Sequence, residues 1–96
     1  DLENPEEVWR VMLELSQDVG HRLRLHKLAA KGVQVYVRSN DLDGVQFQSV
    51  LPLTTQLPSE IAAGAFKLFE ERYSWDKPVR AVCVRAINLR LISQGD

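Results

Sequence analysis

Apolar and polar residues recur with two different periods in this chain, and each period predicts one kind of element. Residues 77–89 alternate with period two, which is the repeat of side chains on a β-strand. One face of this predicted strand is mostly aliphatic and can cover a core; it carries Arg80, Val82 and Val84. The other face is smaller and more polar; it carries Ala81, Cys83 and Arg85.

Two segments instead show the three-and-four spacing of amphipathic helices. The first helix is predicted from about residue 5 to about residue 25, because Asn4 can cap the free amides and Pro5 suits the first turn. The second is predicted from Pro58 to about Tyr73. Gly20 interrupts the first helix and indicates a point of close packing. The inward positions are Val8, Met12, Leu15, Val19 and Leu23, followed by Ile61, Ala65, Leu68 and Phe69.

Two further strands are predicted at residues 33–38 and 45–51, where apolar side chains alternate with polar ones. The three valines of the first of these strands are expected to face the core. Residues 29–32, 39–44 and 52–58 are interpreted as a connector, a turn and a loop. Phe47 and Tyr73 are expected in or near the core, and Trp75 is expected to anchor over the helix ends.

The order of these elements, α-β-β-α-β, predicts an α+β fold in a single domain, residues 1–96. We expect a two-layer sandwich, with both helices on one face of a small, mainly antiparallel sheet and the other face open to water. One more strand before Asp1 would complete a β-α-β-β-α-β arrangement, and we expect that this first strand is missing here. The edge left unpaired could then produce an artificial dimer.

Composition is ordinary for a globular protein, at 45% hydrophobic and 26% charged residues, with a net charge of -1. A net negative charge mildly disfavours a nucleic-acid partner. However, the acidic residues gather in the predicted helices and the basic residues in the predicted strands, so the sheet could still attract phosphate groups. No apolar segment approaches the roughly 20 residues that cross a membrane. The single cysteine, Cys83, cannot form an internal disulfide, so a cytoplasmic location is expected.

Groups with catalytic or metal-binding chemistry are too scattered to form a site. Asp41 and Asp43 lie in the predicted turn and lack the other ligands of a calcium loop. His21 and His26 are five residues apart, which is the wrong phase for joint metal binding from a helix. Cys83 has no histidine near it in sequence. We therefore expect no catalytic residue, metal or cofactor in this chain.

The outward positions of the three strands form the one coherent polar cluster. Amide, hydroxyl and guanidinium groups bond phosphate oxygens without reading bases, so this face is a candidate for the DNA backbone. A plain solvated sheet face remains the alternative. Lys77, ahead of the last strand, could also reach a backbone. The candidate DNA-binding residues are Gln34, Tyr36, Arg38, Gln46, Gln48, Cys83, Arg85 and Lys77.

Five segments, in order along nearly the whole chain, carry a resemblance to a known family. None is a strict motif by itself, and the likeness lies in their order and spacing. They are residues 11–19 (VMLELSQDV), 22–26 (RLRLH), 51–54 (LPLT), 77–80 (KPVR) and 84–89 (VRAINL). The chain resembles the little-finger domain of bacterial Y-family translesion DNA polymerases, of the UmuC/DinB type.

The resemblance implies a noncatalytic domain, tethered behind a palm, fingers and thumb, that lies in the major groove of primer–template duplex DNA and grips both backbones. By position, Arg85 matches the family's arginine on the DNA side of the last strand. Arg38 matches the family's basic residue at the end of the first strand predicted here. The parent would be a DNA-directed DNA polymerase that uses Mg²⁺ in its palm. A sliding clamp is implied as a partner of the parent only, through a peptide beyond this chain.

This sequence departs from the family at two places on the proposed face. Residues 47–50 (FQSV) stand where the family often has arginines, and Ala81 stands where some relatives have one. Fewer cations predict weak DNA binding with a shallow salt dependence. The sequence leaves open whether the parent is polymerase IV-like or V-like. The alternative function is a ferredoxin-like protein-interaction or regulatory module that uses the sheet face or its edge.

Overall fold

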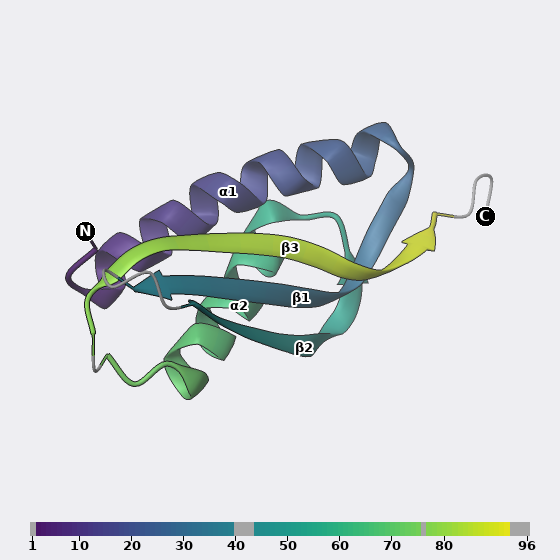
Figure 1. Ribbon diagram of the computed structural model, residues 1–96. Helices are drawn as coiled ribbons and strands as arrows, with labels where there is room; N and C mark the ends of the chain where they lie inside the picture. The colour runs from purple at the N-terminus through teal and green to yellow at the C-terminus, as the bar shows by residue number, and fades with distance from the viewer. Residues whose placement is uncertain (1, 40–43, 76, 93–96) are drawn as a thin grey trace.

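The computed structural model describes residues 2–39, 44–75 and 77–92. Within them the elements are α1 (Pro5–Leu25), β1 (Leu28–Ser39), β2 (Gly44–Thr55), α2 (Pro58–Arg72) and β3 (Val79–Leu91) (Figure 1). The predicted order α-β-β-α-β is therefore confirmed. Both helices match their predicted bounds within one residue, and Asn4 caps α1 by accepting a hydrogen bond from the Glu7 amide.

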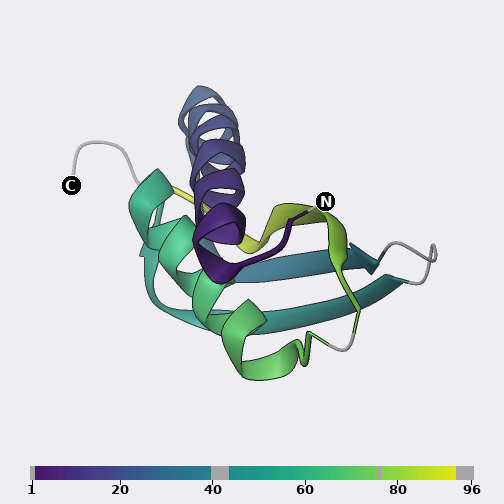
Figure 2. The same cartoon turned by 90° about the vertical axis from the view of Figure 1, so that its left-hand side faces the viewer.

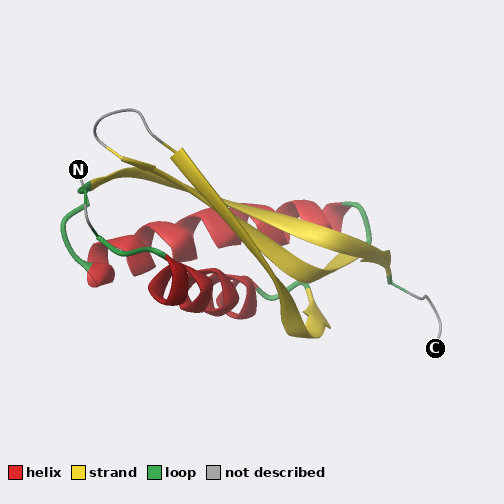
Figure 3. Cartoon of the chain, turned by 60° about the horizontal axis from the view of Figure 1, so that its bottom comes forward, coloured by secondary structure: helices red, strands yellow, loops and turns green. Residues whose placement is uncertain are grey.

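The three strands form one antiparallel sheet in the order β2-β1-β3. Both helices lie on the same side of it, so the predicted α+β sandwich is confirmed (Figures 2 and 3). The helices pack against each other, with α1 also against β3 and α2 also against β2. The opposite face of the sheet is covered by no described element. None of the described helices combines the length and the apolar character needed to span a membrane.

The core lies between the central strand and the two helices. Val33, Val35 and Val37 face it as predicted, and they meet Met12 of α1 and Phe69 of α2. Gly20 is the close packing point that the sequence indicated. A Cβ atom there would lie 2.8 Å from the Gln56 carbonyl oxygen and 2.9 Å from Pro58 Cγ. The connection from β2 to the start of α2 therefore approaches α1 more closely than a larger side chain would allow.

An aromatic cluster covers the C-terminal end of α2. The Phe69 ring stacks on Tyr73 at 5.2 Å between centroids and meets Trp75 edge-on at 5.5 Å. The Tyr73 hydroxyl donates a hydrogen bond of 2.7 Å to the Lys77 carbonyl oxygen. Trp75 thus anchors the helix end, and Tyr73 and Phe47 are near-core residues, as predicted.

The predicted connector at residues 29–32 is wrong, because β1 already begins at Leu28. Ala29 and Ala30 pair with Arg90 and Leu89 of β3, and both alanines are buried. Alanine has little preference for strands, so the alternation of side chains could not reveal this part of the strand. A register shift between Ala30 and Gly32 on the β2 side further hides the period.

The predicted loop at residues 52–58 is also wrong in its first half, because β2 continues to Thr55. Pro52 is compatible with this strand because β2 is an edge strand, where a missing N–H donor can face solvent. The Lys31 Nζ atom donates a hydrogen bond of 2.9 Å to the Pro52 carbonyl oxygen. Of the predicted turn at residues 39–44, residues 40–43, with Asp41 and Asp43, lie outside the described residues.

The start of β3 corrects one further prediction. Arg80 was expected on the same face as Val82, but Arg80 is exposed and Val79 is fully buried. The reason is a register shift at this point, where Ser39 pairs with Val79 while Arg38 pairs with Ala81. One extra residue on β3 reverses the faces before it. Beside it, the Leu2 amide donates a hydrogen bond of 2.7 Å to the Val79 carbonyl oxygen.

Candidate nucleic-acid interface

Three cross-strand rows of side chains make up the open face of the sheet. Residues directly opposite each other on neighbouring strands point to the same face, so the register places the side chains. Arg85 lies opposite Gln34, Cys83 opposite Tyr36, and Ala81 opposite Arg38. Continued onto β2, the rows read Gln48–Gln34–Arg85, Gln46–Tyr36–Cys83 and Gly44–Arg38–Ala81. We call these three rows the open-face rows.

Seven of the eight residues predicted for DNA binding lie in the open-face rows. The structure brings together Gln34, Tyr36, Arg38, Gln46, Gln48, Cys83 and Arg85. The eighth, Lys77, lies apart from them in the connection before β3. The strand alternation was sufficient to place the seven on one face, because their period is two and no register shift falls between them.

Short-range contacts orient the polar groups within the open-face rows. The Gln34 Nε2 amide group donates a hydrogen bond of 3.3 Å to the side-chain oxygen Oε1 of Gln48. The Tyr36 ring lies across the start of β2, where a Cβ atom on Gly44 would be only 2.0 Å from the Tyr36 hydroxyl oxygen. Gly44 therefore supports the position of Tyr36, a role that the alternation of side chains did not reveal.

The two arginines of the open-face rows are exposed and unpaired. Neither Arg38 nor Arg85 has a hydrogen bond or ion pair with any described residue. The ion pairs among the described residues, Glu6–Arg10 and Asp18–Arg22, are both on α1. The guanidinium groups of Arg38 and Arg85 are thus available for an anionic ligand.

The open face turns apolar beyond Gln34 and Arg85. Ile87 lies opposite Gly32, where a Cβ atom would be 2.9 Å from Ile87 Cγ1 and 2.8 Å from Asn88 Nδ2. The absence of a side chain at Gly32 thus leaves room for the Ile87 and Asn88 side chains to pack against β1. Val50, opposite Gly32 on the other side, is 66% exposed. The polar part of the face therefore ends at the row that contains Gln34 and Arg85.

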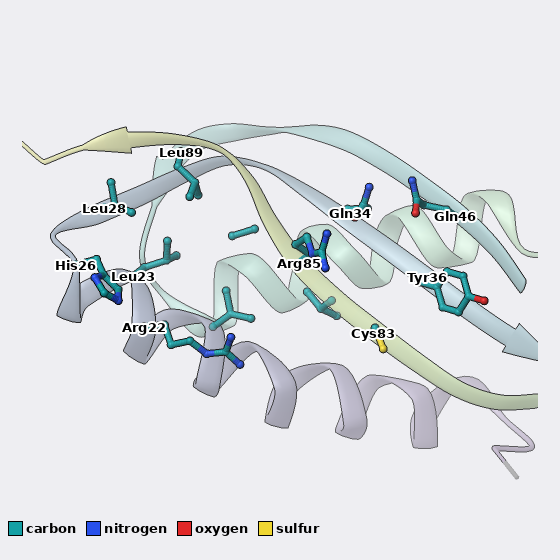
Figure 4. A pocket seen from close by; sticks show the side chains of 13 residues that line it. Arg22, Leu23, His26, Leu28, Gln34, Tyr36, Gln46, Cys83, Arg85 and Leu89 are labelled. Atoms are coloured by element: carbon teal, nitrogen blue, oxygen red, sulfur yellow. The ribbon is translucent and has the colours of Figure 1, made fainter.

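At its β3 edge the open face is hollowed into a pocket of about 530 Å³ (Figure 4). Of the residues that line this pocket, α1 contributes Arg22 and Leu23, and β3 contributes Arg85 and Leu89. His26, the C-cap of α1, also lines it. From sequence, His26 was considered as a metal ligand, and Arg22 within the segment 22–26 that carries the family resemblance. Neither was connected to Arg85, because their proximity depends on how α1 lies against the sheet.

Comparison with known proteins gives the family. The whole chain, residues 1–96, matches the model described as the impB/mucB/samB family C-terminal domain. The chain is 38% identical over 89 residues to a DNA polymerase IV of Acetivibrio thermocellus, a match that covers 93% of this chain. The chain spans 22% of the length of that relative. The resemblance drawn from the sequence is confirmed: this chain belongs to the impB/mucB/samB family, as a C-terminal domain.

Proposed function

We propose that this domain binds the phosphate backbones of duplex DNA through its open-face rows and holds primer–template DNA for a translesion DNA polymerase. The observation that carries the proposal is the gathering of amide, hydroxyl and guanidinium groups in three adjacent rows, with Arg38 and Arg85 unpaired among the described residues. Such groups bond phosphate oxygens without reading bases, which suits a polymerase that must work on any sequence.

The spacing of the two arginines supports contact with both DNA strands. Arg85 lies opposite Gln34, four residues along β1 from Arg38. At a rise of about 3.4 Å per residue, their positions are about 14 Å apart along the sheet. The major groove of DNA is about 12 Å wide, so one arginine can meet each of the two backbones that border it.

The relationship to other proteins supports the proposed parent. The relative from Acetivibrio thermocellus is named as a DNA polymerase IV, and this chain matches 22% of it. We propose that the parent is likewise a DNA polymerase, in which a palm, fingers and thumb perform Mg²⁺-dependent nucleotide transfer. This domain would then contribute no catalytic group. It would bind DNA while linked covalently to the polymerase core. Tethering raises the effective concentration of DNA at its surface, so weak intrinsic binding suffices.

The test is a fluorescence-anisotropy titration of a labelled duplex with the 96-residue chain at two salt concentrations. Arg85→Glu should weaken binding by about tenfold, because it removes a phosphate contact and adds a repulsive charge to the face. The matched control is Arg72→Glu at the end of α2, which changes the net charge equally but lies in the helix layer. If the two substitutions weaken binding equally, the loss of affinity reflects only the change in net charge, and the proposal is contradicted.

A second candidate function, a protein-interaction module of ferredoxin-like shape, has one observation in its favour. Val50 and Leu53 on the edge strand β2 are 66% and 68% exposed. They border a pocket of about 660 Å³ between β2 and α2. The same titration separates the two functions. DNA binding that is absent, or insensitive to both salt and Arg85→Glu, would favour the interaction module.

A further inference from the structure

The pocket at the β3 edge joins cations from two elements that are distant in sequence. Arg22 comes from α1 and Arg85 from β3, and both line the same pocket together with His26 (Figure 4). Figure 1 shows that α1 runs along the same edge of the sheet as β3, and Arg22 and Leu23, near the end of α1, line the pocket together with residues of β3. The open face is therefore bordered at its β3 edge by helix α1.

The chemistry of the pocket suits a phosphate group. Arginine presents a rigid fork of donors that matches the oxygens of phosphate, and the imidazole of His26 offers at least one further N–H donor. The rest of the pocket includes apolar side chains, among them Leu23, Val84 and Leu89. Apolar surroundings strengthen the attraction between a guanidinium group and a phosphate, because less water screens the charges.

One acidic group stands next to this cluster. The Asp18 carboxylate pairs with the Arg22 guanidinium one turn away on α1, and both side chains are largely exposed, at 60% and 69%. An exposed pair of this kind is weak, so a phosphate can replace the carboxylate as partner of Arg22. Asp18 is then a competitor that lowers the affinity of the pocket for an anion.

We propose that the pocket between α1 and β3 seats a DNA backbone phosphate, that Arg22 is a DNA-binding residue acting beside Arg85, and that Asp18 competes with that phosphate for Arg22. The inference rests on the proposed function, since it extends the DNA-binding surface from the sheet onto the helix. It places the contacted backbone across the β3 edge.

The chain contains a matched control for this test. Glu6 and Arg10 form an ion pair with the same four-residue spacing on the same helix, and both are exposed, at 75% and 74%. Arg10 lies twelve residues before Arg22, which is about 18 Å along the helix. That distance exceeds the screening length of about 8 Å at physiological salt. Arg10 and Glu6 do not line the pocket.

The experiment measures duplex binding of the 96-residue chain by fluorescence anisotropy over a series of salt concentrations. Arg22→Ala should weaken binding by about threefold and reduce the slope of log affinity against log salt by about 1. Asp18→Asn should do the opposite and tighten binding by about threefold, since it removes both a competitor and a negative charge. Arg10→Ala and Glu6→Gln should each change the affinity by much less. Circular dichroism confirms that the variants fold.

The outcomes separate this inference from the proposed function. Suppose that Arg85→Glu weakens binding but Arg22→Ala changes the affinity no more than Arg10→Ala does. The sheet face then binds DNA and α1 does not, so the proposed phosphate site between α1 and β3 is refuted. If Asp18→Asn fails to tighten binding more than Glu6→Gln does, the competition is refuted. If neither Arg85→Glu nor Arg22→Ala has an effect, or the duplex does not bind, both the proposed function and this inference fail.

Discussion

The covered face and the open face of the sheet are made from alternate residues of the same strands. On the covered face, Val33, Val35 and Val37 are 0%, 0% and 1% exposed and pack against two helices. On the open face, Gln34 is half-buried, while Tyr36 and Arg38 are exposed. The comparison teaches that core residues and residues of the proposed DNA-binding face alternate within one strand, so substitutions one residue apart should affect different properties.

The largest effect is expected on the covered side, at Phe69. Phe69 is fully buried and packs against Tyr73 and Trp75. Phe69→Ala should lower the free energy of unfolding by about 3–5 kcal/mol, because it removes buried apolar surface and leaves a cavity. Urea unfolding followed by circular dichroism measures this value. Phe47→Ala is the control, since Phe47 is only half-buried on an edge strand and its loss should cost clearly less.

The sharpest test of the comparison uses the neighbours Gln34 and Val35, each changed to threonine. Val35→Thr should lower the free energy of unfolding by about 1–3 kcal/mol, because it buries a hydroxyl group among apolar side chains. Gln34→Thr should leave stability nearly unchanged but weaken duplex binding, since it removes an amide from the open-face rows. Thermal unfolding and anisotropy titration of the same samples give both values. A loss of stability of similar size in both variants would show that the two faces are not energetically separate.

A smaller effect is expected where α1 meets the connection between β2 and α2. Alanine is normally favoured over glycine in a helix by about 1 kcal/mol. At Gly20 the new methyl group would meet the backbone oxygen of Gln56 at 2.8 Å, so Gly20→Ala should destabilise by about 1 kcal/mol instead. At Gly64 of α2 the nearest atom, at 2.4 Å, is the end of the Leu51 side chain, which can rotate away. Gly64→Ala should therefore be less harmful than Gly20→Ala in the same unfolding assay.

Local pattern was enough to predict both helices and the face assignment along most of the sheet. Asn4 and Pro5 mark the start of α1 by chemistry that acts within one helical turn. The alternation through residues 33–38 identified Val35 as a core residue and Gln34, Tyr36 and Arg38 as outward residues. These features follow from the sequence because they depend on the period of a strand or helix, which is a property of neighbouring residues.

Three features were decided only by tertiary structure. Ala29 and Ala30 are part of β1, and Pro52 is part of β2, because neighbouring strands and strand order determine where a ladder continues. Val79 is buried instead of Arg80 because a register shift inserts an extra residue opposite Ser39. Arg22 joins Arg85 at one pocket because α1 runs beside β3. Each depends on residues far apart in the chain, and the hydrophobic pattern of a segment contains no information about which distant backbone lies next to it.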